Sequence, residues 1–264
     1  MVGELGMNNA LIGYTGFVGG NILEQNDFDQ LYNSKNFQEM RNKNFDEVVC
    51  AGVSAVKWVA NKEPDVDRNN IKQLEDVLSS ISADRFVLIS TIDVYPDTYG
   101  KDESFDCSLV ESNSYGAHRL EFEKFCMENF SNCFIIRLPG LFGNGLKKNV
   151  IYDLVNHNCL EMINPASSFQ YYDLKNIWSD IKKAISSELH LVNLFTEPVK
   201  TQTIIDRFFS DEKFDDLASS PAPEAHYALK SIYAPQWGGE NGYIYSESQV
   251  LAQLDDFIKR LRET

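Results

Sequence analysis

The chain has 264 residues and a formal net charge of −15 at pH 7. Hydrophobic residues make up 43% of it and aromatic residues 12%, which excludes a disordered chain and provides material for a sizeable core. The acidic balance argues against a nucleic-acid partner, which needs a basic surface, and against binding to an anionic membrane.

The first part of the chain alternates short apolar runs with helical segments. Strands are predicted at residues 9–14, 28–34, 45–52, 85–91 and 133–139. Helices are predicted at residues 21–25, in a stretch through Ala60, and at 69–81 and 114–125. Strands separated by helices indicate βαβ units, and continuously apolar strands fit a sheet that is covered on both faces. We therefore predict an α/β fold, a Rossmann-type doubly wound parallel sheet.

The alternation loosens after residue 156. A strand or turn followed by a helix is predicted over 168–185, a strand over 189–195, a helix over 201–209, and a final amphipathic helix over 246–261 that a serine opens. This pattern predicts a first domain over residues 1–156 and a smaller C-terminal lobe over 157–264. One or two segments of the lobe are expected to return to the main sheet.

The five cysteines are odd in number and form no CxxC pair. This usage is typical of reduced thiols in the cytoplasm, and it favours neither a disulfide framework nor a metal site. No segment reaches transmembrane length, and the first residues lack the basic and apolar regions of a signal peptide. A cytoplasmic protein is therefore expected. Residues 1–6 are either native or an extension before Met7.

A glycine-rich segment, "ALIGYTGFVGG", joins the first predicted strand to the first helix. Gly13, Gly16 and Gly19 have GxxGxxG spacing, which allows backbone N–H groups and a helix N-terminus to approach a pyrophosphate. The strand–turn–helix setting makes dinucleotide binding the favoured function of this turn, against a glycine turn that binds nothing. The expected cofactor-binding residues of the turn are Gly13, Thr15, Gly16, Phe17, Val18 and Gly19.

The end of the second predicted strand bears on the choice of cofactor. Dinucleotide-binding folds often place an acid there to bind the adenosine ribose, but this chain has "YNSKN". Asn33, Ser34 and Lys35 suit a 2′-phosphate, which slightly favours NADP over NAD. The alternative is that Lys35 is simply solvated.

Tyr115 and Arg119 lie four residues apart on a predicted helix, and Phe122 and Cys126 continue the same stripe. Residues at this spacing lie one above another, so both side chains should point inward. The alternatives are a hydrogen-bonded core tyrosine beside a paired arginine, or a tyrosine that carries chemistry. His118 lies one step off the stripe and is expected to be structural.

Nearly the whole chain resembles the extended short-chain dehydrogenase/reductase family, whose members act on nucleotide sugars. The motifs are "GYTGFVG" for the nucleotide loop, "LISTIDVYP" for the strand with the catalytic hydroxyl, "YGAHR" at the family's YxxxK, and "IIRLPGLFGNGLKKN" for the nucleotide-sugar site. Within the family, "AVKWVANKEP" and "SSFQYYDLKNIWSDI" resemble segments of the dTDP-4-dehydrorhamnose reductase branch.

The resemblance implies that Tyr115 is the general acid/base, that Thr91 orients the reacting oxygen, and that Arg119 replaces the family lysine. Lysine lowers the pKa of the tyrosine and holds the nicotinamide ribose; arginine keeps the charge but cannot give up its proton. Further cofactor-binding positions, besides Tyr115 and Arg119, are Ala51, Gly52, Asn70, Ser90 and Leu138.

Substrate contacts are expected from eight residues: Lys57, Asp93, Arg137, Lys147, Lys148, Asn149, Gln170 and Tyr172. The cations would hold a diphosphate in an otherwise acidic chain. Solvated side chains are the alternative for Lys57 and Lys148, and an internal ion pair is the alternative for Arg137. Gln170 and Tyr172 are equally consistent with packing, and Asp93 with either a second acid/base or a turn.

The leading functional hypothesis is an NAD(P)-dependent oxidoreductase that reduces a 4-keto nucleotide sugar. In this hypothesis the first domain binds NADP or NAD, and the C-terminal lobe binds the nucleotide-sugar substrate. An epimerase of the same family is the alternative, and a dehydratase ranks lower because "STIDVY" offers only Asp93 as an extra acid. A non-catalytic dinucleotide-binding sensor or scaffold is the third possibility, and the family likeness suggests a homodimer.

Overall fold

The structure, a computed structural model, describes residues 8–110, 112–211 and 222–263, so residues 1–6, native or an extension, lie outside the described residues. The chain groups into two compact units, each assembled from three segments. Unit 1 comprises Met1–Pro96, Asp106–Arg137 and Lys175–Val192, and unit 2 comprises Asp97–Phe105, Leu138–Leu174 and Asn193–Thr264. The units interleave along the chain, whereas the sequence predicted one boundary after residue 156.

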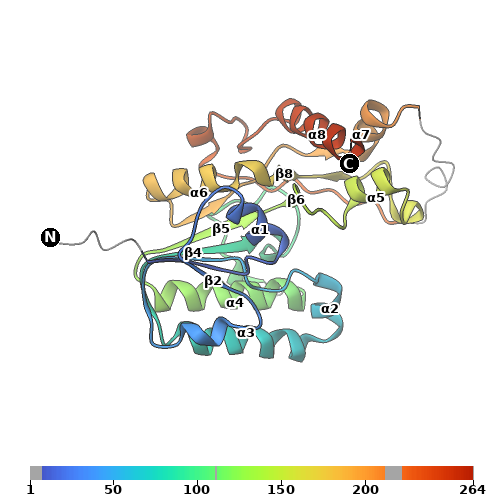
Figure 1. Cartoon of the computed structure of the whole chain (residues 1–264). Helices are drawn as coiled ribbons and strands as arrows, with labels where there is room; N and C mark the ends of the chain where they lie inside the picture. Colours follow the sequence, from blue (N-terminus) through green and yellow to red (C-terminus); the bar gives the residue numbers. More distant parts are fainter. Residues whose placement is uncertain (1–7, 111, 212–221, 264) are drawn as a thin grey trace. The chain divides into compact units, whose positions relative to one another are not determined.

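A six-stranded sheet with the strand order β2-β1-β3-β4-β5-β9 forms the centre of unit 1 (Figure 1). The pairs β1–β2, β1–β3 and β3–β4 are parallel, and the predicted α/β fold is confirmed. The strand order reverses beside β1, the place where open α/β sheets bind ligands at the carboxyl ends of their strands. The strands are β1 Asn9–Ile12, β2 Gln30–Tyr32, β3 Asn44–Cys50, β4 Ser82–Thr91, β5 Cys133–Leu138 and β9 Leu191–Asn193.

Helices cover both faces of this sheet. Helices α3 and α4 run side by side on one face, and α1 and α6 pack on the other (Figure 1). Apolar residues of α3 and α4 join the buried strands in a core that includes Val48, Phe86, Phe122 and Ile135. The helices are α1 Phe17–Leu23, α2 Lys57–Lys62, α3 Pro64–Leu78, α4 Ser114–Asn129 and α6 Ile177–Ser186.

The two helical stretches predicted between residues 53 and 81 are distinct helices, α2 and α3, that break at Glu63. Proline disfavours a helical conformation in the residue before it, and Glu63 has φ −128° and ψ 64°. Pro64 then takes the first position of α3, where its missing N–H is not needed. Farther along the chain, β9 lies beside β5 in the large sheet, and the segment Lys175–Val192, which contains α6, belongs to unit 1.

Unit 2 contains two small sheets, a parallel pair β6–β8 and an antiparallel pair β10–β7. The last helix begins with a capping box, in which Ser246 and Gln249 bind each other's backbone N–H groups. Helix α5 and strand β6 were not predicted, because the sequence between residues 140 and 156 is rich in turn-forming residues. The elements are β6 Gly140–Phe142, α5 Val150–Asn156, β7 Ser168–Phe169, β8 Tyr171–Asp173, β10 Val199–Lys200, α7 Thr201–Phe208 and α8 Glu247–Arg262.

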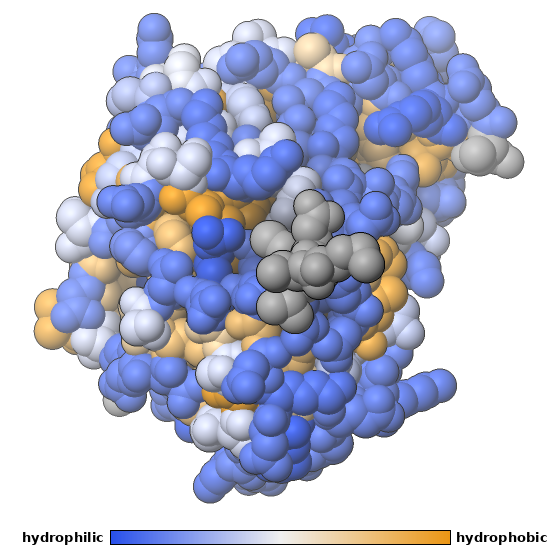
Figure 2. Space-filling view, turned by 60° about the vertical axis from the view of Figure 1, so that its left-hand side comes forward, coloured by the Kyte–Doolittle hydropathy of each residue, from blue (hydrophilic) through white to orange (hydrophobic). Residues whose placement is uncertain are grey.

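Figure 2 shows one face of the molecule, on which hydrophilic residues predominate and hydrophobic residues occur in separate patches. Some apolar surface is normal for a folded protein. All five cysteines are free thiols, and four of them are buried. Among the described residues, no helix combines the length and the apolar character needed to cross a membrane.

Candidate active site

The glycine turn between β1 and α1 depends on close backbone packing at two of its glycines. Gly13 has φ +86°, and a Cβ atom there would lie 2.4 Å from the carbonyl oxygen of Ala51. A Cβ atom on Gly19 would lie 2.1 Å from the carbonyl oxygen of Gly13. Side chains at these two positions would therefore separate β1 from β3 and from α1. The structure thus brings Gly13 together with Ala51 and Gly52, as a shared cofactor site requires.

Gly16 differs from its two neighbours. It precedes α1, it is exposed, and the nearest atom to an added Cβ is the Gly13 carbonyl oxygen at 3.2 Å. The first turn of a helix leaves its N–H groups without intrahelical acceptors. Gly16 therefore keeps the approach to this turn open, and an added Cβ would crowd one backbone atom, the Gly13 carbonyl oxygen.

The loop after β2 lies against the same turn. Asn33 donates a hydrogen bond from Nδ2 to the Tyr14 hydroxyl at 3.2 Å, and its Oδ1 accepts from the Lys35 backbone N–H at 2.8 Å. The side chains of Ser34 and Lys35 are exposed. Asn33 therefore shapes the loop, while Ser34 and Lys35 remain available to a ligand.

Tyr115 is held at the start of α4 by three neighbours. Asn113 caps the helix by accepting a hydrogen bond from the Gly116 N–H at 3.1 Å, and Asn61 of α2 accepts from the Tyr115 N–H at 3.0 Å. A Cβ atom on Gly116 would lie 2.1 Å from the Asp93 carbonyl oxygen. The missing side chain at Gly116 thus allows the first turn of α4 to pack against the segment that follows β4.

The close packing of α4 brings the two predicted catalytic hydroxyl groups together. The side chain of Thr91, at the end of β4, hydrogen-bonds to that of Tyr115. Thr91 also accepts a hydrogen bond from the Asp93 N–H at 3.2 Å. The Asp93 carboxylate forms an ion pair with Lys57 of α2 at 2.5 Å, so both charged residues lie near the phenol.

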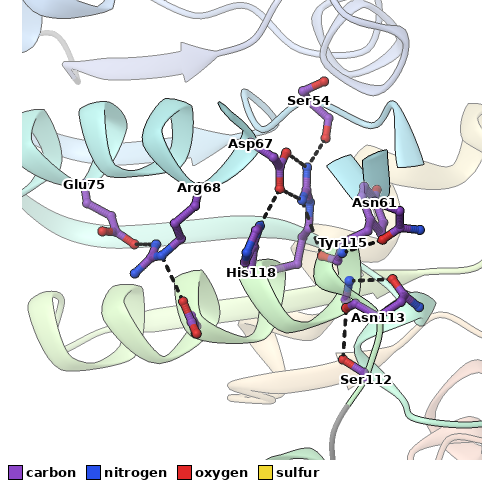
Figure 3. Close-up of polar contacts among 12 residues, drawn as sticks. Ser54, Asn61, Asp67, Arg68, Glu75, Ser112, Asn113, Tyr115 and His118 are labelled. Carbon is purple, nitrogen blue, oxygen red and sulfur yellow. Dashed lines mark hydrogen bonds and ion pairs between the residues drawn. The ribbon is translucent and has the colours of Figure 1, made fainter. Parts of the chain in front are cut away.

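Arg119 lies one helical turn beyond Tyr115 and is 5% exposed. Its Nη2 donates to Asp67 Oδ1 at 2.8 Å and to the Ser54 carbonyl oxygen at 2.5 Å, and its Nη1 donates to Asp67 Oδ2. Its guanidinium carbon lies 3.9 Å from the centroid of the Tyr115 ring. Figure 3 shows Asp67 and His118 pointing toward each other, with His118 Nδ1 2.7 Å from Asp67 Oδ2.

The environment decides the protonation of Tyr115. Burial raises the pKa of the phenol, and it outweighs the opposing effects of the Arg119 charge, the Lys57 charge and the Thr91 hydrogen bond. The expected stabilisation of the phenolate by Arg119 is therefore present, but it does not determine the net direction. Tyr115 is a protonated phenol at neutral pH, able to donate a proton.

Arg137 forms the internal ion pair that was the alternative to a diphosphate contact. Its Nη2 donates to Glu123 at 2.6 Å, its Nε donates to the same carboxylate at 3.0 Å, and its Nη1 donates to the Tyr95 hydroxyl at 3.0 Å. Ser90, expected to bind cofactor, also donates to Glu123. Since Arg137 and Glu123 are buried, this network joins α4 to the ends of β4 and β5.

Two expected substrate residues of unit 2 are packing residues instead. The amide of Gln170 is 1% exposed and bonds the backbone at Thr196 and Leu229. Tyr172 is fully buried, with its ring stacked on that of Tyr245 at 6.4 Å. These two side chains stabilise the interior of unit 2, because burial and internal partners leave them no access to a substrate.

The remaining expected residues differ in exposure. Asn149 caps α5 by accepting from the Tyr152 N–H at 3.0 Å, and its Nδ2 donates to the Leu141 carbonyl oxygen. Leu138 is buried at the end of β5. The exposed members of the set are Lys147, Lys148 and Asn70.

Sequence reasoning missed Asn61, Asp67, Gly116 and Glu123. One signal was available for the carboxylates, because each lies on the apolar stripe of its helix. Asp67 precedes the buried residues Ile71 and Leu74 of α3 at helical spacing, and Glu123 lies on the buried side of α4. A carboxylate on a buried stripe needs a cation.

Three solved structures share the fold of the chain. A dTDP-4-dehydrorhamnose reductase from Clostridium acetobutylicum has a TM-score of 0.70 at 14% identity, over 97% of this chain and 100% of that one. A dTDP-4-dehydrorhamnose reductase from Bacillus anthracis, in complex with NADP, has a TM-score of 0.61 at 16% identity, over 84% of this chain and 85% of that one. A UDP-glucuronic acid 4-epimerase from Bacillus cereus, in complex with a UDP-sugar and NAD, has a TM-score of 0.65 at 16% identity, over 97% of this chain and 100% of that one.

Sequence comparison gives the family. No curated protein matches the chain. The sequence model described as the NAD dependent epimerase/dehydratase family matches residues 26–165, more than half of the chain. This match confirms the resemblance found in the sequence: the chain belongs to the NAD dependent epimerase/dehydratase family.

Proposed function

We propose that the protein is an NAD(P)-dependent oxidoreductase that reduces the 4-keto group of a nucleotide-activated sugar. The observation that carries the proposal is the buried Tyr115 phenol with a hydrogen bond from the partly exposed Thr91 side chain, in the same unit as the glycine turn. Family membership supports a nicotinamide cofactor, and the similar structures with NADP or NAD support both forms.

A protonated Tyr115 is the form that can act as the acid in a reduction. When bound, the nicotinamide would supply a hydride to the carbonyl carbon of the sugar. Tyr115 would donate its proton to the carbonyl oxygen, and the Thr91 hydroxyl would orient that oxygen, so that the carbonyl becomes an alcohol. Because burial raises the pKa of Tyr115, the phenol is already protonated at neutral pH, as this direction requires.

The cofactor would be held by residues of unit 1. The turn from Gly13 to Gly19 would receive the pyrophosphate, and Ser34 and Lys35 would lie near the adenosine ribose. Because no acid follows β2 in this loop, NADP(H) should bind at least as tightly as NAD(H). Calorimetric titration with both measures this, and a clear preference for NAD(H) contradicts the 2′-phosphate argument.

Substitutions in the glycine turn test the cofactor site. Gly16→Val should abolish dinucleotide binding, because its side chain enters the space for the phosphate. Circular dichroism checks that the variant is folded, since its Cβ would lie 3.2 Å from the Gly13 carbonyl oxygen. Gly20→Ala is the matched control, since a Cβ atom there meets only the Tyr14 carbonyl oxygen at 3.6 Å. A folded Gly16→Val variant that binds normally would show that the turn is not the site.

Lys147 and Lys148 are the candidates for a diphosphate contact. A ligand that binds only the folded form raises the melting temperature. We expect such a rise with at least one of UDP, GDP, dTDP and CDP at millimolar concentration, which would also identify the base. The double variant Lys147→Ala/Lys148→Ala should lose the rise while it keeps dinucleotide binding. Mass spectrometry of ligands retained by the native protein provides an independent identification.

An epimerase is the second candidate, because the family name and one of the similar structures include that activity. The two reactions differ in redox balance. A reductase consumes one NAD(P)H for each sugar, whereas an epimerase restores its cofactor and returns a stereoisomer. Absorbance at 340 nm together with chromatography of the sugar nucleotide separates them. Absence of both changes would instead support a dinucleotide-binding sensor, and a homodimer remains a prediction for light scattering.

A further inference from the structure

We propose that Asp67 is a positioning residue, which fixes the guanidinium of Arg119 against the ring of Tyr115 and limits the positive charge that the phenol experiences. The proposal rests on the proposed function, in which Tyr115 transfers the proton. The family pattern places lysine at position 119, so a carboxylate that binds arginine here is a property of the residues of this chain.

The geometry shows how Asp67 would fix the guanidinium. Both of its carboxylate oxygens accept from Arg119, one from Nη2 at 2.8 Å and the other from Nη1. The Ser54 carbonyl oxygen accepts from Nη2 at 2.5 Å, and the Tyr115 carbonyl oxygen accepts from Nη1 at 3.3 Å. Two hydrogen bonds from one guanidinium to one carboxylate fix its plane as well as its position.

The pair also determines the charge beside the phenol. The guanidinium carbon of Arg119 lies 3.9 Å from the Tyr115 ring centroid, and Asp67 and Arg119 are both nearly excluded from solvent. Arginine cannot lose its proton, so this position carries a permanent cation. A carboxylate bound to that cation cancels part of its field, whereas an unpaired guanidinium would favour the phenolate more strongly.

Other charged groups face the same residues and define the controls. Tyr115 experiences the charges of Arg119 from α4, Asp93 from the segment after β4, and Lys57 from α2. Asp67 faces His118 in addition to Arg119. A test of the proposal must therefore change Asp67 or Arg119 alone and leave the Lys57–Asp93 ion pair in place.

The test is titration of the Tyr115 phenol by fluorine NMR in protein labelled with 3-fluorotyrosine, with the signal assigned by its absence in Tyr115→Phe. Asp67→Asn should move the titration midpoint to lower pH, because Arg119 loses its counter-charge. Arg119→Met should move it to higher pH, on the order of one pH unit. The double variant loses both charges of the pair, so its midpoint should lie between those of Arg119→Met and the parent. Asp67→Glu keeps the negative charge, so the titration midpoint of its Tyr115 phenol should stay near that of the parent.

A purely structural Asp67 predicts a different pattern, in which Asp67→Asn lowers the melting temperature and leaves the phenol titration unmoved. That result, or shifts of the same sign in both single variants, would overturn the proposal. If Asp67→Asn does not unfold cooperatively, Asp67→Ser makes the same measurement, because it leaves room for water beside the guanidinium.

Turnover separates this proposal from the proposed function. The alkaline limb of kcat should move in the same directions as the NMR titration, with KM for the sugar nucleotide unchanged. Opposite NMR shifts without turnover in the parent would support the role of Asp67 and contradict the reductase. Turnover in the parent with an unmoved titration in Asp67→Asn would support the reductase and overturn the role of Asp67.

Discussion

Two buried arginines of unit 1 each pair with a carboxylate and lie against a tyrosine ring, but the other residues around the two pairs differ. Arg119 pairs with Asp67 and faces Tyr115, and Arg137 pairs with Glu123 and faces Tyr95. The Glu123 carboxylate is fully enclosed, and its further partner is Ser90. The Asp67 carboxylate binds His118, whose side chain is 14% exposed, and its arginine touches a phenol that is bound to Thr91. A buried ion pair beside a tyrosine therefore does not by itself mark a functional site, because unit 1 contains two of them.

The largest expected effect is on folding, in Arg137→Met. It leaves Glu123 as an unpaired carboxylate in the interior, and breaking a buried pair in this way destabilises by about 3–5 kcal/mol. Urea unfolding measures the loss. The double variant Glu123→Gln/Arg137→Met should recover part of it, because no buried charge remains. Unchanged stability with a loss of nucleoside-diphosphate binding would instead restore Arg137 as a substrate residue.

The next effect is on turnover, in Tyr115→Phe. The variant keeps the ring and removes the proton, so turnover should fall about 100-fold, or about 2.7 kcal/mol in the barrier, while dinucleotide binding is retained. Tyr95→Phe is the matched control from the other arginine. This variant should be about 1 kcal/mol less stable, because it loses the hydrogen bond that Arg137 donates to the Tyr95 hydroxyl. Its turnover should be unchanged. Parental turnover in Tyr115→Phe would make Tyr115 a core residue.

The sequence predicted the parts of this comparison that follow from periodicity. The spacing of Tyr115, Arg119, Phe122 and Cys126 placed all four on the buried side of one helix, and all four are buried. The parallel sheet followed equally directly from the alternation of apolar runs with helical segments. Local pattern suffices for such features, because the period of apolar residues along the chain indicates which face of a helix or strand can be buried.

The hydrogen-bond and ion-pair partners of buried polar residues could not be predicted from such patterns. Arg137 was expected to hold a diphosphate because the acidic chain needs cations there, but Glu123, from another element, already neutralises it. Gln170 likewise finds its partners at Thr196 and Leu229, far along the chain. Such pairings depend on tertiary contacts, and a sequence pattern does not specify which polar group will face which.

A smaller effect, with a defined pH dependence, is expected from Asp67→Asn. Burial raises the pKa of Asp67, but hydrogen bonds and charges from Arg119 and His118 outweigh it, and the net pKa is lowered from 3.8. A carboxylate with a lowered pKa stabilises the fold above its unfolded pKa, and this contribution disappears as the pH falls through the folded value. Near neutral pH the variant should lose about 1–3 kcal/mol.

Parallel unfolding of the parent and Asp67→Asn at several pH values measures this dependence. The difference should begin to shrink below about pH 4, where the carboxylate of the unfolded parent becomes protonated, and it should be lost as the pH falls through the lower pKa of the folded state. The loss should stay below that of Arg137→Met, because Arg119 keeps its hydrogen bonds to the Ser54 and Tyr115 carbonyl oxygens. A difference that stays constant with pH would mean that the Asp67 charge does not stabilise the fold.

The smallest effect is expected from His118→Asn. The imidazole Nδ1 lies 2.7 Å from Asp67 Oδ2, the oxygen that also accepts from Arg119 Nη1. An asparagine amide can donate to the same oxygen, and the arginine alone keeps the carboxylate paired. The variant should therefore lose less than about 1 kcal/mol and keep its turnover. His118→Leu, which removes the donor, should lose slightly more stability and again keep turnover. If either variant lost turnover as Tyr115→Phe does, His118 would belong to the proton-transfer machinery.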